Sequence, residues 1–133
     1  MGNFESPLLL EYLDGRQWRI TAGFRFVPLK GSVIEVPAGF ITDFASVPRI
    51  FWRIFPPTGE YGKAAVIHDY LYHYPGTRNR GECDAILFDG MEVLGCGWWT
   101  RHLIHKAVRM GGWRPWGKYR DAEKAHNAAP DTL

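Results

Sequence analysis

The segment AAVIHDYLY, residues 64–72, decides the fold and carries most of the candidate chemistry. Within this segment, five residues recur at the spacing of one helix face: Ala64, Ile67, His68, Leu71 and Tyr72. Such a stripe is the face that a surface helix buries, so His68 should lie in the interior. The segment ECDAILFDGMEVL, residues 82–94, repeats the pattern and places Asp84 on its apolar face. Because only residues 75–79 separate the helical patterns, we expect an antiparallel hairpin with the two stripes facing each other.

A carboxylate on a buried helix face must find partners inside the protein, because an uncompensated buried charge is costly. The partners within reach of Asp84 are His68, Tyr72, Arg78 and Arg80. We therefore expect His68, Asp69, Tyr72 and Asp84 to converge. Two interpretations stay open from this pattern: the cluster ties two helices together, or it performs catalysis or binds a metal ion.

Outward from these helices, the first third of the chain predicts β-structure. The expected strands cover residues 8–13, 16–20, 24–26, 32–36 and 40–42. The pair Asp14-Gly15 between the first two strands favours a hairpin turn. Short strands separated by turns at this spacing indicate a small antiparallel sheet.

Helical patterns cover residues 60–74, 80–94 and 98–110, and proline or glycine closes each of them. A shorter helix is expected from Pro48 to Ile54, with Ser46 as its N-cap. Beyond these, residues 113–133 are expected to form an irregular tail. The predicted fold class is α+β, a small N-terminal antiparallel β-sheet followed by a three-helix segment packed on it. We expect a single domain of residues 1–112 and a basic, aromatic C-terminal tail.

The composition narrows the class of protein without naming a function. The chain has 133 residues, of which 46% are apolar and 15% aromatic, which suits one globular domain. No apolar run approaches the roughly 20 residues of a membrane span, and the N-terminus shows no signal-peptide pattern. A formal net charge of +2 does not by itself favour nucleic-acid binding. We expect Cys83 and Cys96 to be apolar filler.

Three further motifs are ambiguous. Asp43 and Ser46 either cap a turn and a helix or add a carboxylate and a hydroxyl to the pocket of His68. The pair His102 and His105 has the spacing of a metal pair, although a solvated basic face is the simpler interpretation. Residues 97–120 contain basic and aromatic side chains and no acid. They could stack nucleic-acid bases, but such rings more often cover the domain.

Three stretches together resemble a known family. They are VPAGFITDFASVPRIFWRIFPP (residues 36–57), AAVIHDYLY, and ECDAIL followed by a methionine. This combination is similar to the bacteriophage and prophage family catalogued as domain of unknown function 1353, over residues 34–112. The matching positions include Gly39, Thr42, Asp43, Ser46, Pro48, His68, Asp69, Tyr72, Asp84 and Met91. The resemblance implies a phage or prophage origin and no established activity.

The motif His68-Asp69-x-x-Tyr72, followed by Asp84 on the next helix, also resembles the core of phospholipases A2. Carried over, His68 would be the general base that activates water, and Asp69 would hold calcium. Asp84 would orient His68, with Tyr72 as its hydrogen-bond partner. The chain departs from that family in showing neither its glycine-rich calcium loop nor its disulfide framework.

The first functional hypothesis is a small phage-encoded hydrolase, although the residues leave open whether the protein is an enzyme. Its candidate catalytic residues are Asp43, Ser46, His68, Asp69, Tyr72 and Asp84. A divalent cation such as calcium or magnesium is an optional cofactor, with Asp43, His68 and Asp69 as ligands. A neutral, oriented imidazole suits the activation of water at neutral pH.

The alternative hypothesis is a non-enzymatic phage protein, either a tail or assembly component of the virion or a factor that binds a host protein. In that case the same polar cluster pins the helices, and the aromatic surface is the interface. We expect phage or host proteins as partners, no nucleic acid and no transmembrane segment. The expected location is the host cytoplasm or the virion.

Overall fold

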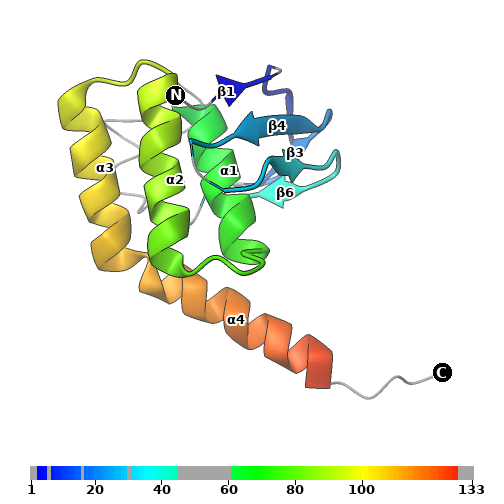
Figure 1. Ribbon diagram of the computed structural model, residues 1–133. Helices are drawn as coiled ribbons and strands as arrows, with labels where there is room; N and C mark the ends of the chain where they lie inside the picture. Colours follow the sequence, from blue (N-terminus) through cyan, green and yellow to red (C-terminus); the bar gives the residue numbers. More distant parts are fainter. Residues whose placement is uncertain (1–2, 6, 16, 30, 45–60, 129–133) are drawn as a thin grey trace.

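The computed structural model describes residues 3–5, 7–15, 17–29, 31–44 and 61–128 (Figure 1). Within these ranges the fold is α+β, as predicted, with six short strands followed by four helices. The strands are β1 (Asn3–Phe4), β2 (Leu10–Tyr12), β3 (Trp18–Ile20), β4 (Phe24–Val27), β5 (Ile34–Val36) and β6 (Ile41–Thr42). The helices are α1 (Gly62–His73), α2 (Arg80–Val93), α3 (Trp98–Gly111) and α4 (Trp113–Ala128). The helix expected from Pro48 to Ile54 and its cap Ser46 lie outside the described residues.

The strands form two three-stranded antiparallel sheets, in the orders β1-β4-β5 and β2-β3-β6. The predicted hairpin is confirmed, because β2 pairs with β3 so that Leu10 lies opposite Ile20 and Tyr12 opposite Trp18. Its turn contains Gly15 at a φ of 59°, a left-handed conformation that glycine adopts without strain. The sheets are small, and neither could be stable without the helices that cover it.

Strand β4 shows how the alternation of side chains creates a buried face. Phe24 and Phe26 are 2% and 0% exposed, and both point into the core. Arg25 between them faces solvent, where its Nε lies 3.3 Å from Oε1 of Glu35 on β5. This alternation is typical of a sheet with one solvent-exposed face and one face packed on the core.

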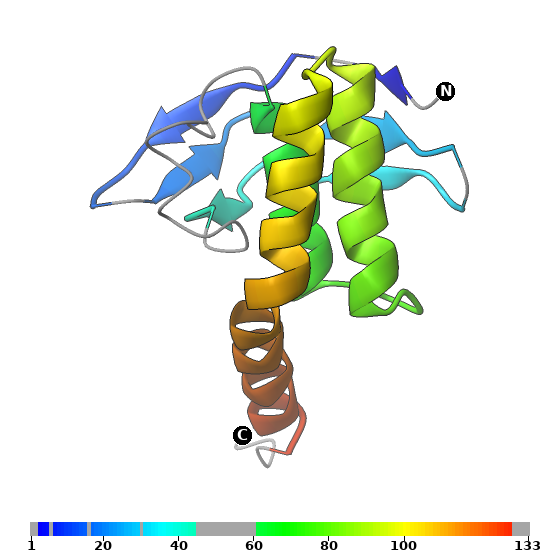
Figure 2. The ribbon, with the colours of Figure 1, turned by 90° about the vertical axis from the view of Figure 1, so that its left-hand side faces the viewer.

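Helix α1 is the central element of the fold. Figure 1 shows it between the strands on one side and α2 on the other, with α3 farthest from the strands. The view from that side, in Figure 2, places α3 in front and the strands behind it. The expected hairpin of α1 and α2 is confirmed. A Cβ on Gly90 would lie 3.0 Å from Cβ of Ala64, so the two helices approach closely there.

A capping box fixes the start of α2, the helix that carries Asp84. The side chain of Asn79 accepts a 2.8 Å hydrogen bond from the Glu82 backbone N–H, and Glu82 accepts one of 3.1 Å from Asn79. These reciprocal bonds satisfy backbone donors that the first turn of a helix leaves unpaired. Among the helices of the described residues, none combines the length and apolar character needed to cross a membrane.

The expectation of an irregular tail over residues 113–133 is wrong, because α4 occupies most of it. A glycine pair and Pro115 look like helix breakers in the sequence. Pro115 lies in the first turn of α4, where no backbone N–H is needed. Arg120 anchors α4 to the end of α1 by donating to the carbonyl oxygens of Tyr72 at 2.7 Å and His73 at 2.9 Å.

Gly112, the C-cap of α3, provides a test of the packing between the helices. A Cβ at this position would overlap the Tyr72 hydroxyl and the Val108 carbonyl oxygen. Gly112→Ala should therefore lower the free energy of unfolding by about 1–3 kcal/mol. A Cβ added to Gly117, inside α4, would have no atom within 4 Å. Gly117→Ala should therefore raise the free energy of unfolding by about 1 kcal/mol. Urea denaturation measures both changes, and effects of the same sign would contradict this packing.

Candidate functional site

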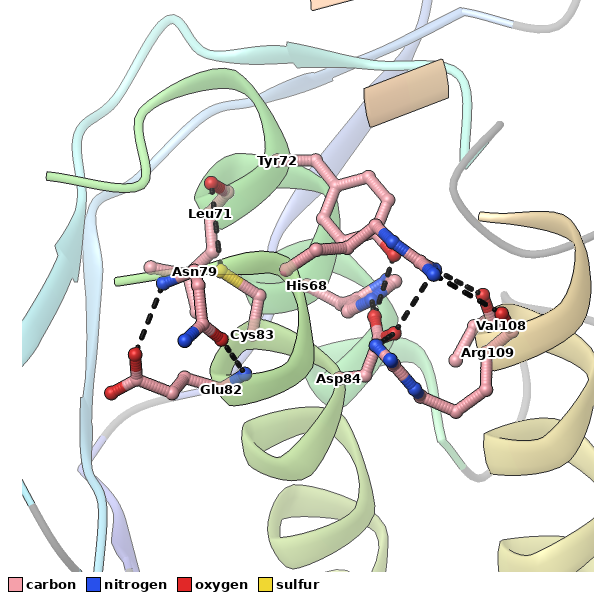
Figure 3. Close-up of polar contacts among 10 residues, drawn as sticks. His68, Leu71, Tyr72, Asn79, Glu82, Cys83, Asp84, Val108 and Arg109 are labelled. Carbon is pink, nitrogen blue, oxygen red and sulfur yellow. Dashed lines mark hydrogen bonds and ion pairs between the residues drawn. The ribbon is translucent and has the colours of Figure 1, made fainter. Parts of the chain in front are cut away.

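Asp84 is the centre of a buried hydrogen-bond cluster between the helices (Figure 3). Its Oδ1 lies 2.6 Å from Nε2 of His68 and accepts a hydrogen bond of 2.6 Å from the Tyr72 hydroxyl. All three side chains are 0% exposed. The predicted contact of Asp84 with His68 and Tyr72 is therefore confirmed, and it joins α1 to α2.

Two arginines complete the cluster at the other carboxylate oxygen. An Nη of Arg109, on α3, lies 2.8 Å from Oδ2 of Asp84, and an Nη of Arg80 lies 3.5 Å from it. Arg80 also donates to the carbonyl oxygens of Val108 at 3.0 Å and Arg109 at 3.2 Å. These contacts extend the cluster from α1 and α2 to α3. We call the five residues the Asp84 hub: His68, Tyr72, Arg80, Asp84 and Arg109.

The charges within the Asp84 hub follow from burial and hydrogen bonding. Burial lowers the pKa of His68 below 6.5, and it outweighs the opposing effect of the Asp84 carboxylate. Burial alone would raise the pKa of Asp84, but hydrogen bonds from His68, Tyr72 and Arg109 hold it below 3.8. At neutral pH the hub therefore contains a neutral imidazole and an ionised carboxylate. Because a carboxylate only accepts, Nε2 of His68 carries the ring proton and Nδ1 does not.

Asp84→Asn tests the charge at the centre of the hub. The variant keeps the shape of the side chain but leaves Arg80 and Arg109 facing an uncharged group. Breaking a buried ion pair costs about 3–5 kcal/mol. Because the Arg109 side chain is 41% exposed and can turn to water, we expect the lower end of that range, about 3 kcal/mol. Guanidinium denaturation at pH 7 measures the loss.

The matched control for this variant is Asp89→Asn on the same helix. The Asp89 carboxylate accepts a 3.3 Å hydrogen bond from the Leu29 backbone N–H at the surface. We expect its free energy of unfolding to change by less than about 1 kcal/mol. A loss for Asp84→Asn no larger than that of Asp89→Asn would show that the hub does not stabilise the fold.

Asp69 follows His68 in the chain but belongs to another cluster, because consecutive helical residues point in different directions. Its Oδ2 accepts a hydrogen bond of 2.6 Å from Oγ1 of Thr42 and lies 3.9 Å from Nε2 of His73. Burial and the nearby carboxylate of Asp69 raise the pKa of the Tyr119 hydroxyl, on α4. Asp69 is 0% exposed and connects β6, α1 and α4.

His73 is the histidine of this second cluster, and its side chain is 30% exposed. Partial burial lowers the pKa of His73, and the charges of Arg120 and Lys118 lower it further, while the charge of Asp43 raises it. The effect of Asp43 places this half-buried carboxylate near the ring. We call the five residues the Asp69 cluster: Thr42, Asp43, Asp69, His73 and Tyr119.

A cavity of about 690 Å³ opens beside His73, between the end of α1 and α4. Its walls include His73, Tyr119, Glu123 and His126, whereas His68 does not line it. The rings of His73 and Tyr119 are in contact, with their centroids 3.8 Å apart and their planes tilted by 30°, so the imidazole is held in place at the edge of the cavity. Two members of the Asp69 cluster, His73 and Tyr119, therefore border this cavity.

The residues predicted for the site thus divide between two clusters. His68, Tyr72 and Asp84 lie in the Asp84 hub, whereas Asp43 and Asp69 lie in the Asp69 cluster. Ser46 lies outside the described residues. Within the part of the chain that the structure describes, no group of three His, Cys, Asp or Glu side chains is placed to hold a metal ion.

Three residues of these clusters were not predicted from the sequence: His73, Tyr119 and Arg109. His73 had a signal, because it lies four positions after Asp69 and must share its helix face. Tyr119 lay in the stretch expected to be irregular. Arg109 contacts Asp84 across the interface between α3 and α2. The spacing of residues within one helix cannot predict such a contact.

Arg78 and the pair His102 and His105 have other partners than those expected. Arg78 is not a partner of Asp84 and instead donates, at 2.9 Å, to a main-chain oxygen of the turn between β4 and β5. His102 and His105 both contact the ring of Phe88, with centroid distances of 5.0 Å and 5.5 Å. His102 and His105 are therefore packed against a ring of α2.

Comparison with known proteins identifies relatives without an assigned activity. The model of a family described as "Protein of unknown function (DUF1353)" matches residues 18–108. An uncharacterised protein of Sinorhizobium fredii, y4jT, is 30% identical over 116 residues, a match that covers 84% of this chain. The chain spans about a third (34%) of the length of that relative. No solved structure matches the chain.

Proposed function

The chain belongs to the DUF1353 family, and from the geometry of its own residues we propose that it is a small hydrolase with His73 as its general base. The observation that carries this proposal is the position of His73, held between Asp69 and an open cavity. A base must touch its substrate, and His73 is the histidine of the two clusters with exposed surface. The reaction class is the transfer of an acyl group to water.

The environment of His73 suits the removal of a proton from water. Burial and nearby cations keep its imidazole neutral at pH 7, so a nitrogen lone pair is available. When water attacks the substrate carbonyl, His73 takes the proton, and the resulting imidazolium gives it to the leaving oxygen. Asp69, 3.9 Å away, and Asp43 stabilise the transient positive charge of the ring. Lys118 and Arg120 supply the positive potential that a developing oxyanion requires.

In this proposal the Asp84 hub positions the helix that carries the base. His68 was the base in the phospholipase-like hypothesis, with Asp84 as its orienting carboxylate. The ring of His68 is 0% exposed and its Nε2 is bonded to Asp84, which suits a positioning residue. Asp43 and Asp69 are oxygen donors of the kind that calcium or magnesium prefers, so a divalent ion remains an optional cofactor of the proposal.

The experiment is the hydrolysis of 4-nitrophenyl acetate by the wild type and by His73→Gln. We expect the substitution to lower kcat/KM at least 100-fold, because general-base catalysis contributes about 10²–10⁴. The wild-type rate should rise with pH and level off, with a midpoint below 6.5, because the base acts when neutral and its pKa is lowered. Repeating the assay in EDTA tests whether a divalent ion takes part.

The matched control is His102→Gln, which removes an exposed histidine of α3 that does not line the cavity. It should keep the wild-type rate. Equal rates for His73→Gln and His102→Gln would overturn the assignment of the base. A wild type that hydrolyses neither this ester, nor 4-nitrophenyl phosphate, nor 4-nitrophenyl glycosides above the buffer rate would overturn the hydrolase.

The second candidate function is a non-enzymatic phage protein, in the virion or bound to a host protein. The exposed tryptophans of α3 favour it, since Trp98 and Trp99 are 54% and 73% exposed. The resemblance to a phage family supports a phage or prophage origin and, with it, a location in the host cytoplasm or the virion. Mass spectrometry of purified particles from an induced host tests this candidate. The chain should be found there at a fixed copy number, and its absence would contradict the virion role.

A further inference from the structure

Helix α3 and the start of α4 expose an unusual set of apolar side chains. Trp98, Trp99, Leu103, Met110 and Trp113 are each between 45% and 73% exposed. Four of them lie on α3, the helix farthest from the sheets in Figures 1 and 2, and Trp113 begins α4. Single exposed apolar residues need no explanation, but a contiguous group of large ones marks an interaction surface.

The spacing of three of these residues makes one stripe along the outside of α3. Trp99, Leu103 and Met110 follow one another at intervals of four and seven, with Lys106 between the last two. The opposite face of the helix is buried, with Ile104 and Val108 at 0% exposure. The stripe is therefore a second apolar face on a helix whose first apolar face already packs on the domain.

The charged residues in the stretch of chain that carries the stripe have one sign. Residues 97–120 contain Arg101, Lys106, Arg109, Arg114, Lys118 and Arg120 and no aspartate or glutamate. Arg114 lies over the Trp113 ring, with 5.2 Å between its guanidinium carbon and the ring centroid. A partner that tolerates this arrangement must be uniformly negative where it meets the cations and apolar where it meets the rings.

From these observations we propose that the α3 stripe docks on the surface of an anionic lipid bilayer. Tryptophan rings sit at the boundary between acyl chains and headgroups, where one edge is apolar and the indole N–H remains wet. Lys106 and Arg114 meet anionic headgroups beside the inserted rings. The convex ridge of a single helix fits a deformable bilayer, and the uniform charge fits a continuous anionic surface. The inference is independent of the hydrolase.

The experiment is flotation of the full chain with vesicles of 70% phosphatidylcholine and 30% phosphatidylglycerol, compared with vesicles of phosphatidylcholine alone. We expect at least tenfold more binding to the anionic vesicles at 50 mM salt and a marked loss at 500 mM salt. The double variant Trp99→Ser, Met110→Ser should lose at least tenfold of the binding. Both side chains are at least 70% exposed, so the variant should keep the fold.

The matched control is the double variant Leu29→Ser, Tyr74→Ser, which removes two side chains that are each 64% exposed elsewhere on the molecule. It should float like the wild type. An absence of flotation with anionic vesicles overturns the proposal. Equal losses in the two double variants, or loss with Lys106→Glu but none with Trp99→Ser, Met110→Ser, overturn ring insertion. Binding of an acidic protein or RNA with no binding of vesicles assigns the stripe to another partner and likewise overturns it.

Discussion

The rest of the structure depends on a carboxylate with no exposed surface at the junction of three helices. Asp84 has a charge that the interior tolerates because His68, Tyr72 and Arg109 all point hydrogen-bond donors at it. These three donors come from α1 and α3, while the acceptor belongs to α2. The helices cannot slide or rotate relative to one another without leaving a buried group unpaired. Apolar packing brings the helices together, and the hub selects one arrangement of them.

This constraint also determines which residues face the cavity. Once α1 is fixed with His68 toward Asp84, the next residue, Asp69, must point to another side of the helix. There it meets Thr42 and Tyr119, and His73 lies one turn further along the same face. The motif of adjacent His and Asp therefore serves two clusters. One lies inside the helical layer, and the other borders the cavity beside α4.

The sequence predicted the parts of the fold that depend on local spacing. The stripe on AAVIHDYLY indicated the buried position of His68, and the acid on the apolar face of α2 indicated its partners. The turn at Asp14-Gly15 indicated the β2–β3 hairpin. The helical α4 was not predicted, because Pro115 reads as a breaker until its position in the first turn is known. Arg109 and Tyr119 could not be assigned, since their contacts join segments distant in the chain and depend on how the helices pack.

The central claim is that a neutral His68 donates its Nε2 proton to an ionised Asp84. The most direct measurement is ¹⁵N NMR of the histidine rings, with His68 assigned through His68→Gln. We expect a ring that is protonated on Nε2 and unprotonated on Nδ1, and that keeps this form as the pH is lowered through 6.5. A ring that carries its proton on Nδ1, or that becomes doubly protonated near pH 6.5, would contradict it.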